Sequence, residues 1–259
     1  MLVLSRTLFG AELPLRDFPV LKSVRGLGIA DSDVYAERLA RLFSYTNMHY
    51  HREPRFDLLR PEPSEFGKYD FVICSDVLEH VEAPVAIAFD TLAQLLKPAG
   101  FLVLTAPYAL DPVSLEHFPA LNEFGLAEVG GKTVLVNRSP NGQYEVYDGL
   151  QFHGGSGATL EMRVFSETAI REHLRAAGLH RIRIHASGSD RHGILSGECS
   201  VPIVASREPF VLTSSAITEL TGQFTFNTRV LRMVRQSRWV RIGRFFGLGP
   251  KIDNTGLSI

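Results

Sequence analysis

The chain has 259 residues, of which 45% are hydrophobic, so it is long and apolar enough for one or two globular domains with a proper core. Its 27 basic and 28 acidic residues give a formal net charge of -1, which excludes a global field that would attract nucleic acid or anionic lipid. The chain contains no run of roughly 18 apolar residues, so we expect no membrane-spanning segment.

The two cysteines, Cys74 and Cys199, are not in a paired spacing. The sequence therefore predicts neither a zinc site nor a disulfide framework, and we expect no bound metal and a reducing cytoplasm. The first residues reach a charge at Arg6 without a long apolar segment, a pattern that does not predict a signal peptide.

The first part of the chain predicts a strand, a tight turn and a helix. Residues 20–28 form an apolar run that ends in a Gly-Leu-Gly turn, and residues 31–43 carry apolar side chains at helical spacing. Residues 46–50 and 55–59 are short β-prone segments, which we interpret as a second and a third strand.

The middle of the chain predicts a βαβ unit. Residues 69–74 are almost continuously apolar, as expected for a parallel strand that is covered on both faces. Residues 84–96 have helical apolar spacing, and the turn residues 97–100 end that helix. Residues 101–105 predict the next strand, so the crossover should be right-handed and the two strands parallel.

A β-hairpin interrupts this order. Residues 132–137 and 143–148 are β-prone and are joined by the turn residues 138–142. We interpret the surrounding segment, about residues 108–160, as an insertion over the sheet.

Regular α/β order then returns. Ser166 is placed to cap a helix over residues 167–177, which Gly178 ends, and strands over 181–185 and 201–205 complete the sheet. The sequence therefore predicts an α/β fold, a Rossmann-like, doubly wound and mostly parallel sheet with a β-hairpin insertion and a C-terminal extension.

We expect residues 1–206 to form the α/β domain and residues 207–259 the extension. In the extension arginine recurs at every third position: Arg229, Arg232, Arg235, Arg238, Arg241 and Arg244. Since an α-helix turns about 100° per residue, these side chains spread around a helix and form no single basic face. The segment is either a tail that contacts a membrane surface or a subunit, or a solvated and partly packed extension.

Two segments resemble a known family. Residues 69–81 read Tyr-Asp-Phe-Val-Ile-Cys-Ser-Asp-Val-Leu-Glu-His-Val, and residues 95–104 read Leu-Leu-Lys-Pro-Ala-Gly-Phe-Leu-Val-Leu. They closely resemble class I S-adenosylmethionine-dependent methyltransferases, and more narrowly the group called type 11, although Ala99 replaces the first glycine of the family's Leu-Lys-Pro-Gly-Gly. The resemblance implies S-adenosylmethionine as cofactor, bound beyond the carboxyl ends of the parallel strands.

The resemblance also implies a set of cofactor-binding residues. These are Gly26, Gly28, Asn47, Asp57, Asp76 and Glu79. The chain departs from the family at the glycine turn, because Arg25 precedes it and the third glycine is missing, and we expect Asp31 or Asp33 to compensate. The second strand lacks the usual acidic residue for the ribose hydroxyls, so Asn47 is the candidate there. Asp57 has an equally good interpretation as a loop-capping aspartate.

Methyl transfer asks the protein mainly for alignment, because the sulfonium already makes the methyl group electrophilic. If the acceptor is a hydroxyl, a base must take its proton, and we predict His80 and His153 as catalytic residues, with His117 as a further candidate. The three histidines and Glu79 also have a structural interpretation, as loop-anchoring or capping residues. Tyr108 either lines the acceptor site or packs.

The sequence favours a methyltransferase that O-methylates a small-molecule or glycan acceptor. The alternative is a catalytically inactive methyltransferase-fold protein that serves as a binding or assembly module, which the incomplete glycine turn favours. A nicotinamide dinucleotide enzyme would need Gly-x-Gly-x-x-Gly and an acidic residue about 20 positions on, and neither is clean in this chain. We expect no nucleic-acid partner and, at most, a peripheral membrane or subunit contact through the tail.

Overall fold

The computed structural model describes residues 1–153, 159–194 and 200–237. At its centre lies a six-stranded sheet in the order β13-β14-β4-β3-β1-β2. Its strands are β1 (Leu21–Ile29), β2 (Phe43–Met48), β3 (Tyr69–Ser75), β4 (Leu96–Thr105), β13 (Arg181–Ile184) and β14 (Ile203–Ser206). β1 pairs in parallel with β2 and β3, and β3 with β4, whereas β14 runs antiparallel to both neighbours. The predicted Rossmann-like, mostly parallel sheet is confirmed.

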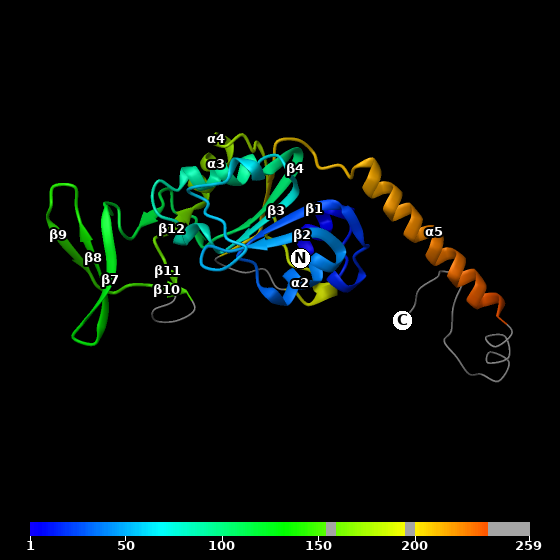
Figure 1. The fold of residues 1–259 in the computed structure, drawn as a ribbon, viewed down its shortest axis with the longest axis horizontal. Helices are drawn as coiled ribbons and strands as arrows, with labels where there is room; N and C mark the ends of the chain where they lie inside the picture. Colours follow the sequence, from blue (N-terminus) through cyan, green and yellow to red (C-terminus); the bar gives the residue numbers. More distant parts are fainter. Residues whose placement is uncertain (154–158, 195–199, 238–259) are drawn as a thin grey trace.

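Helices cover both faces of this sheet (Figure 1). They are α1 (Leu2–Phe9), α2 (Asp33–Leu42), α3 (Ala86–Leu95), α4 (Glu167–Ala176) and α5 (Ser214–Gln236). β3 shows why two layers form, because its alternate residues enter different cores: Val72 and Cys74 pack with α3 and α4, and Phe71 and Ile73 with α1 and α2. The unbroken apolar run in the sequence is thus explained by burial on both faces.

Most of the predicted elements form within a few residues of their expected bounds, but the third strand does not. Residues 55–59, all of them described, contribute only an isolated bridge between His49 and Arg55. The segment turns instead, because the Asp57 carboxylate accepts a hydrogen bond from the Leu59 N–H at 2.9 Å. Its apolar residues Phe56 and Leu58 are buried in the core beneath α3. The alternation of apolar and polar residues in this segment therefore reflects burial and not pairing with another strand.

The helix after the insertion begins as predicted. The Ser166 hydroxyl accepts a hydrogen bond from the Ala169 N–H at 3.0 Å, which satisfies an otherwise unpaired amide of the first turn. Gly178 follows the helix with φ of +84°, a conformation that glycine adopts without strain.

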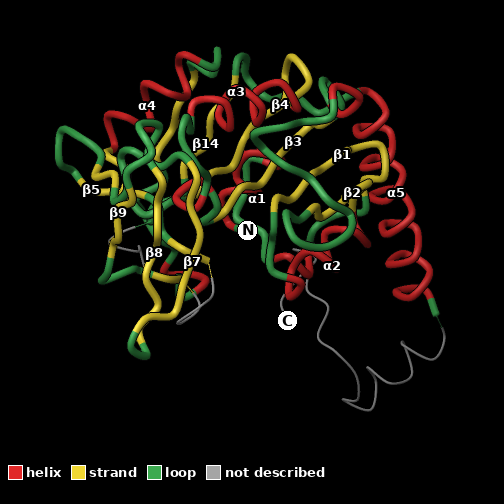
Figure 2. The backbone as a smooth tube through the Cα atoms, turned by 60° about the vertical axis from the view of Figure 1, so that its left-hand side comes forward, coloured by secondary structure: helices red, strands yellow, loops and turns green. Residues whose placement is uncertain are grey.

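The insertion is a three-stranded antiparallel sheet of β7 (Glu123–Val129), β8 (Lys132–Arg138) and β9 (Tyr144–Tyr147). The predicted hairpin corresponds to β8 and β9, and β7 was not predicted. The sequence pattern that could have revealed β7 is the Gly130-Gly131 turn between β7 and β8, in which both glycines have a positive φ. Figures 1 and 2 place this sheet at the end of the molecule away from α5.

Four short strands connect the insertion to the main sheet. They are β5 (Tyr108–Ala109), β6 (Leu115–Glu116), β10 (Phe152–His153) and β11 (Thr159–Leu160). β12 (Arg163–Ser166) lies between β5 and β6 and leads into α4. A third small core of Phe118, Leu135, Leu160 and Met162 holds the inserted sheet to these strands.

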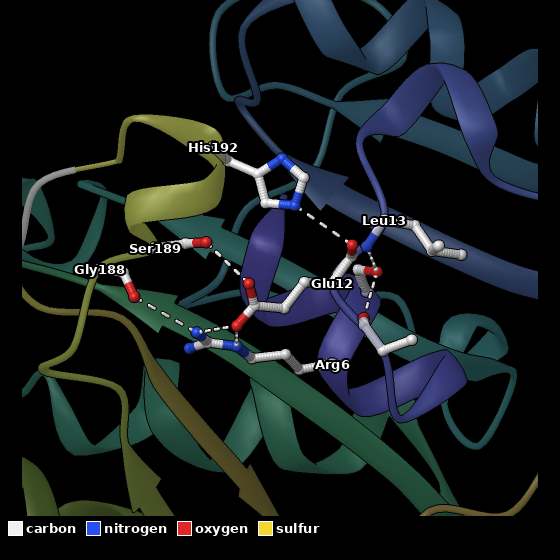
Figure 3. A network of polar contacts seen from close by, with 8 residues as sticks. Arg6, Glu12, Leu13, Gly188, Ser189 and His192 are labelled. Carbon is white, nitrogen blue, oxygen red and sulfur yellow. Dashed lines mark hydrogen bonds and ion pairs between the residues drawn. The ribbon is translucent and has the colours of Figure 1, made fainter. Parts of the chain in front are cut away.

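A network of polar contacts holds the N-terminal helix in place (Figure 3). The sequence did not predict this network. The guanidinium of Arg6 pairs with the Glu12 carboxylate and also donates to the Gly188 carbonyl at 3.4 Å. The Ser189 hydroxyl donates to the same carboxylate at 2.7 Å, and His192 Nε2 lies 3.2 Å from the Glu12 carbonyl oxygen. The side-chain hydrogen bonds from Arg6 and Ser189 lower the pKa of Glu12. The network ties α1 to the turn after β13.

Only the first part of α5 packs on the main body. The Glu219 carboxylate accepts hydrogen bonds from the Ser23 N–H and hydroxyl, both at 3.1 Å, and Ala216 is buried in the second core. The helix then extends away from the sheet and exposes Phe224, Phe226 and Met233 (Figure 1). None of the helices in the described parts of the chain is long and apolar enough to span a membrane.

Of the recurring arginines, Arg229, Arg232 and Arg235 lie on α5. Arg238, Arg241 and Arg244 lie outside the described residues. The division of the chain at residue 206 stays a prediction.

Candidate functional site

The carboxyl ends of β1 to β4 meet at one edge of the sheet, where most of the predicted site residues lie. Asp76 directly follows β3 and has a positive φ of 52°. Its N–H donates to the Thr105 carbonyl at 2.9 Å, and its carboxylate accepts from the Ser200 hydroxyl at 3.0 Å. This exposed carboxylate lies at the carboxyl end of β3, the edge at which sheets of this type bind ligands.

The glycine pair lies within the first strand, not at the turn that follows it. Gly26 and Gly28 are both part of β1, and the turn to α2 consists of residues 30–32. A Cβ atom at Gly26 would overlap the Phe71 ring, and one at Gly28 would overlap the Tyr45 hydroxyl. These glycines are therefore needed for close packing across the sheet, and the expectation of a Gly-Leu-Gly turn is wrong.

A buried carboxyl occupies the space beyond Gly28. Asp31 is 3% exposed and accepts hydrogen bonds from the Tyr45 hydroxyl and, at 2.9 Å, from the Tyr35 hydroxyl. Its burial raises its pKa to about 6, although these two hydrogen bonds act in the opposite direction. Asp31 stabilises the turn from within, whereas Asp33 is exposed and pairs with Arg52 at 2.9 Å.

The side-chain amide of Asn47 forms hydrogen bonds within the fold. Its Oδ1 accepts from the Asp31 N–H at 2.9 Å, and its Nδ2 donates to the Asp31 carbonyl at 2.7 Å. This reciprocal pair joins the end of β2 to the end of β1. Asp57 serves its own loop, as described above, and the roles of both residues toward a cofactor stay predictions.

Glu79 is a fully buried carboxyl group in this site. It lies in a 3-10 turn over Leu78–His80, its side chain is 0% exposed, and neither carboxylate oxygen has a hydrogen-bond partner among the described residues. Burial is the main reason that its pKa is raised to about 8, and the negative charges of Asp76 and Glu161 add to this effect. A buried carboxyl without partners requires an explanation, because burial costs it the hydrogen bonds that it makes in water.

Two predicted catalytic histidines adjoin Glu79. His80 Nε2 lies 3.8 Å and His153 Nδ1 3.5 Å from the Glu79 Oε1 atom, and the two imidazole rings meet edge to face at 4.7 Å. His80 Nδ1 lies 2.8 Å from the Leu160 carbonyl oxygen. The tertiary structure thus brings His153 to the adjacent residues Glu79 and His80, although it lies more than 70 positions further along the sequence.

A second carboxylate completes the cluster. Glu161 accepts from His153 Nε2 at 2.8 Å through one oxygen and from His117 Nε2 at 2.9 Å through the other. The sequence did not predict Glu161, since a single glutamate in a loop carries no local signal. His117, a candidate by residue type, joins the cluster only through Glu161.

Arg163 holds the turn that carries Glu79 and His80. Its side chain is buried, and Nη1 donates to the carbonyls of Leu78, at 3.0 Å, and Val81. Its Nε pairs with Glu116 at 2.7 Å. An arginine in a short strand is unremarkable in sequence, so no pattern identified this residue.

A pocket of about 440 Å³ opens beside His80. It lies between the inserted sheet and the 3-10 turn and is lined by His51, His80, Phe124, Gly125, Leu126, Thr159, Leu160 and Met162. Tyr108, the residue expected to line the acceptor site or to pack, packs against the core beneath α3. The insertion therefore provides one wall of the pocket.

The carboxyls of this edge also affect Cys74. Burial and then the charges of Glu79, Asp31 and Asp76 raise the pKa of its thiol well above the usual value. The three carboxyls thus surround the end of β3, with Cys74 among them as a buried, inert thiol.

Residues 28–183 match the family model of the methyltransferase domain. A ubiquinone biosynthesis O-methyltransferase of Xanthomonas campestris pv. campestris is 33% identical over 125 residues, which are 48% of this chain and 46% of the relative. The corresponding protein of Marinobacter nauticus is 29% identical over 122 residues, which are 47% of this chain and 46% of the relative. The chain thus matches about half the length of these curated relatives.

Solved methyltransferase structures are similar at lower identity. One is 1,6-didemethyltoxoflavin-N1-methyltransferase of Burkholderia thailandensis, with 14% identity, coverage of 73% of this chain and 71% of that chain, and a TM-score of 0.42. Another is an S-adenosylmethionine-dependent methyltransferase of Clostridium acetobutylicum, with 12% identity, coverage of 80% and 97%, and a TM-score of 0.44. Since the family model spans more than half of its residues, the chain belongs to the methyltransferase domain family.

Proposed function

We propose that the protein is an S-adenosylmethionine-dependent methyltransferase that O-methylates a small-molecule or glycan hydroxyl. The observation that carries this proposal is the placement of His80 on the pocket wall, four residues after the exposed carboxylate of Asp76 at the ligand-binding edge of the sheet. The names of the curated relatives, which are O-methyltransferases, support oxygen as the acceptor atom.

The cofactor would bind at the carboxyl ends of β1 to β3. The exposed Asp76 and the amino end of α2, where Ser32 makes no capping hydrogen bond through its side chain, are polar groups that fit this cofactor. In our proposal Gly28, Asn47 and Asp57 border the cofactor at this edge of the sheet. Bound S-adenosylmethionine would supply an electrophilic methyl group.

His80 and His153 are the proposed catalytic residues on the acceptor side. The Leu160 carbonyl orients His80, and the Glu161 carboxylate orients His153, so each ring keeps one nitrogen that faces Glu79. In this proposal one of the two histidines takes the proton of an acceptor hydroxyl in the pocket that His80 and β7 line.

Titration of the protein with S-adenosylhomocysteine, followed by calorimetry, tests the cofactor site. We expect saturable binding that Asp76→Asn weakens, because asparagine tolerates the positive φ and removes only the charge. The matched control is Asp90→Asn on the exposed surface of α3, which should leave binding unchanged. Methyl transfer from labelled S-adenosylmethionine to phenol, catechol and saccharide panels then identifies the acceptor class.

One observation favours the alternative of a catalytically inactive binding or assembly module. Asn47 and Asp31 satisfy each other inside the fold, and side chains fill the space next to Gly26 and Gly28. If the folded protein shows no binding of S-adenosylhomocysteine up to millimolar concentration, the module becomes the favoured function.

Two further proposals concern the contacts and the cellular compartment of the protein. We propose a peripheral membrane or subunit contact through α5, supported by its exposed Phe224, Phe226 and Met233 beside Arg229 and Arg232. We also propose a reducing cytoplasm, on the basis of the low cysteine content.

A further inference from the structure

The buried carboxyl group of Glu79 makes no hydrogen bond with the described residues, although the guanidinium of Arg163 binds the same turn. Both of its oxygens are shielded from solvent, and the guanidinium hydrogen-bonds to the backbone of the turn and to Glu116 instead. A buried carboxyl group without a hydrogen-bond partner is rare, and a bound cation, which would displace the carboxyl proton, is one of the few groups that satisfies it.

The two imidazoles present their lone pairs to this carboxylate. His80 Nδ1 lies 2.8 Å from the Leu160 carbonyl, an acceptor only, so this nitrogen carries the proton and Nε2 has the free lone pair. His153 Nε2 lies 2.8 Å from the Glu161 carboxylate, so Nε2 donates and the lone pair is on Nδ1. The free nitrogens are the two that face Glu79 Oε1, at 3.8 and 3.5 Å.

We propose that Glu79, His80 and His153 bind a divalent metal ion. Their three ligand atoms lie within 4.8 Å of one another. Oxygen and nitrogen atoms that bind one ion at about 2.1 Å in tetrahedral geometry lie about 3.4 Å apart, close to the separations from Glu79 Oε1. Two imidazoles and one carboxylate favour zinc or another first-row transition ion over magnesium or calcium, which prefer oxygen ligands.

The surroundings have the form of an outer ligand shell. Histidines that bind metals almost always donate their other ring N–H to a carboxylate or a backbone carbonyl. Glu161 and the Leu160 carbonyl do this for His153 and His80, and His117 in turn holds the second oxygen of Glu161. The expectation of no metal rested on the lack of paired cysteines, and this set of ligands contains no cysteine.

One of the three proposed ligands, His80, lines the pocket, so an ion bound by them would lie at the edge of the pocket. A hydroxyl that binds the ion there would release its proton to solvent water more readily, since a divalent cation lowers the pKa of a bound oxygen. The histidines would then act on the acceptor through the ion and not as free bases. This use of the ion rests on the proposed function, whereas metal binding itself does not.

Cobalt substitution tests the site directly. The untagged protein is treated with EDTA and titrated with Co²⁺, followed by its visible absorption, and competed with Zn²⁺. We expect one ion per chain. Glu79→Gln and His153→Ala should each weaken Co²⁺ binding at least about 100-fold, because even outer-shell changes cost about 10- to 100-fold.

The matched control is His180→Ala, an exposed histidine at the amino end of β13, which should bind Co²⁺ as the unchanged protein does. Glu79→Gln should remain folded, since glutamine keeps the shape and removes the buried charge, and Zn²⁺ should raise the melting temperature of the unchanged protein but not of this variant. Absence of 1:1 binding, or unchanged binding in both ligand variants, overturns the proposal.

The metal-free and metal-loaded proteins are also titrated with S-adenosylhomocysteine. If this ligand binds while Co²⁺ does not, the metal site is refuted and the proposed methyltransferase function stands. If Co²⁺ binds while the ligand does not, the metal site stands and the proposed function fails.

Discussion

Ionisation of the buried Asp31 should be visible in the pH dependence of stability. Its pKa is raised from 3.8 to about 6 in the folded protein, mainly by burial, so the folded state holds a proton that the unfolded chain releases near pH 4. Because the native state binds more protons between these pKa values, the free energy of unfolding falls as the pH rises through this interval. The contribution of Asp31 is complete below about pH 4 and lost above about pH 6.

The size of the effect follows from the shift. Each pKa unit corresponds to about 1.4 kcal/mol, so Asp31 accounts for a total loss of about 3 kcal/mol, of which about 2 kcal/mol falls between pH 4 and pH 7. Asp31→Asn keeps the shape of the side chain and removes the titration. Lost hydrogen bonds from Tyr35 or Tyr45 would lower the stability of the variant by an amount that does not depend on pH in this range.

Urea unfolding followed by circular dichroism between pH 4 and pH 7 gives the required free energies. The difference between the unchanged protein and Asp31→Asn should fall by about 2 kcal/mol over this range. Asp33→Asn is the matched control, because that neighbouring carboxylate is exposed and should give a constant difference. Parallel pH profiles for the unchanged protein and Asp31→Asn would refute the reasoning.

Three other changes test the packing around the site by the same unfolding assay. Arg163→Met should cost at least about 2 kcal/mol, because two buried carbonyls lose their donor, and it should also weaken Co²⁺ binding; a near-neutral effect contradicts the anchoring role. Gly28→Ala should cost about 1 to 3 kcal/mol, because its methyl group meets Tyr45, whereas Gly125→Ala, which meets nothing, should cost less; equal losses contradict the close packing. Ser166→Ala should cost about 1 kcal/mol through the lost cap of α4, and an unchanged midpoint would argue against that cap.

The elements that were predicted well have local physical causes. The β3–α3–β4 unit was readable because a strand covered on both faces must be apolar at nearly every position, and the start and end of α4 because Ser166 and Gly178 satisfy backbone requirements within a few residues. The prediction for residues 55–59 was wrong because buried Phe56 and Leu58 follow the same alternation in a turning loop as in a strand.

Some residues of the candidate site could likewise be predicted from local sequence, and others could not. Asp76, Glu79 and His80 could be placed together from sequence, since they follow one strand within five residues and the carboxyl end of a parallel strand is where ligands bind. The contribution of His153 to the same cluster, and those of Glu161 and Arg163, depend on how the insertion folds back against that strand.

The sequence by itself thus determined the α/β class, the family and the turn that carries Glu79, because apolar periodicity, capping residues and a contiguous motif are properties of neighbouring residues. Only the tertiary structure decided that the glycines of β1 pack against Phe71 and Tyr45. It also decided that two histidines more than 70 positions apart face one buried carboxyl group, which has no hydrogen-bond partner in the described part of the chain. Contacts of this kind depend on the path of the whole chain, and no local pattern encodes them.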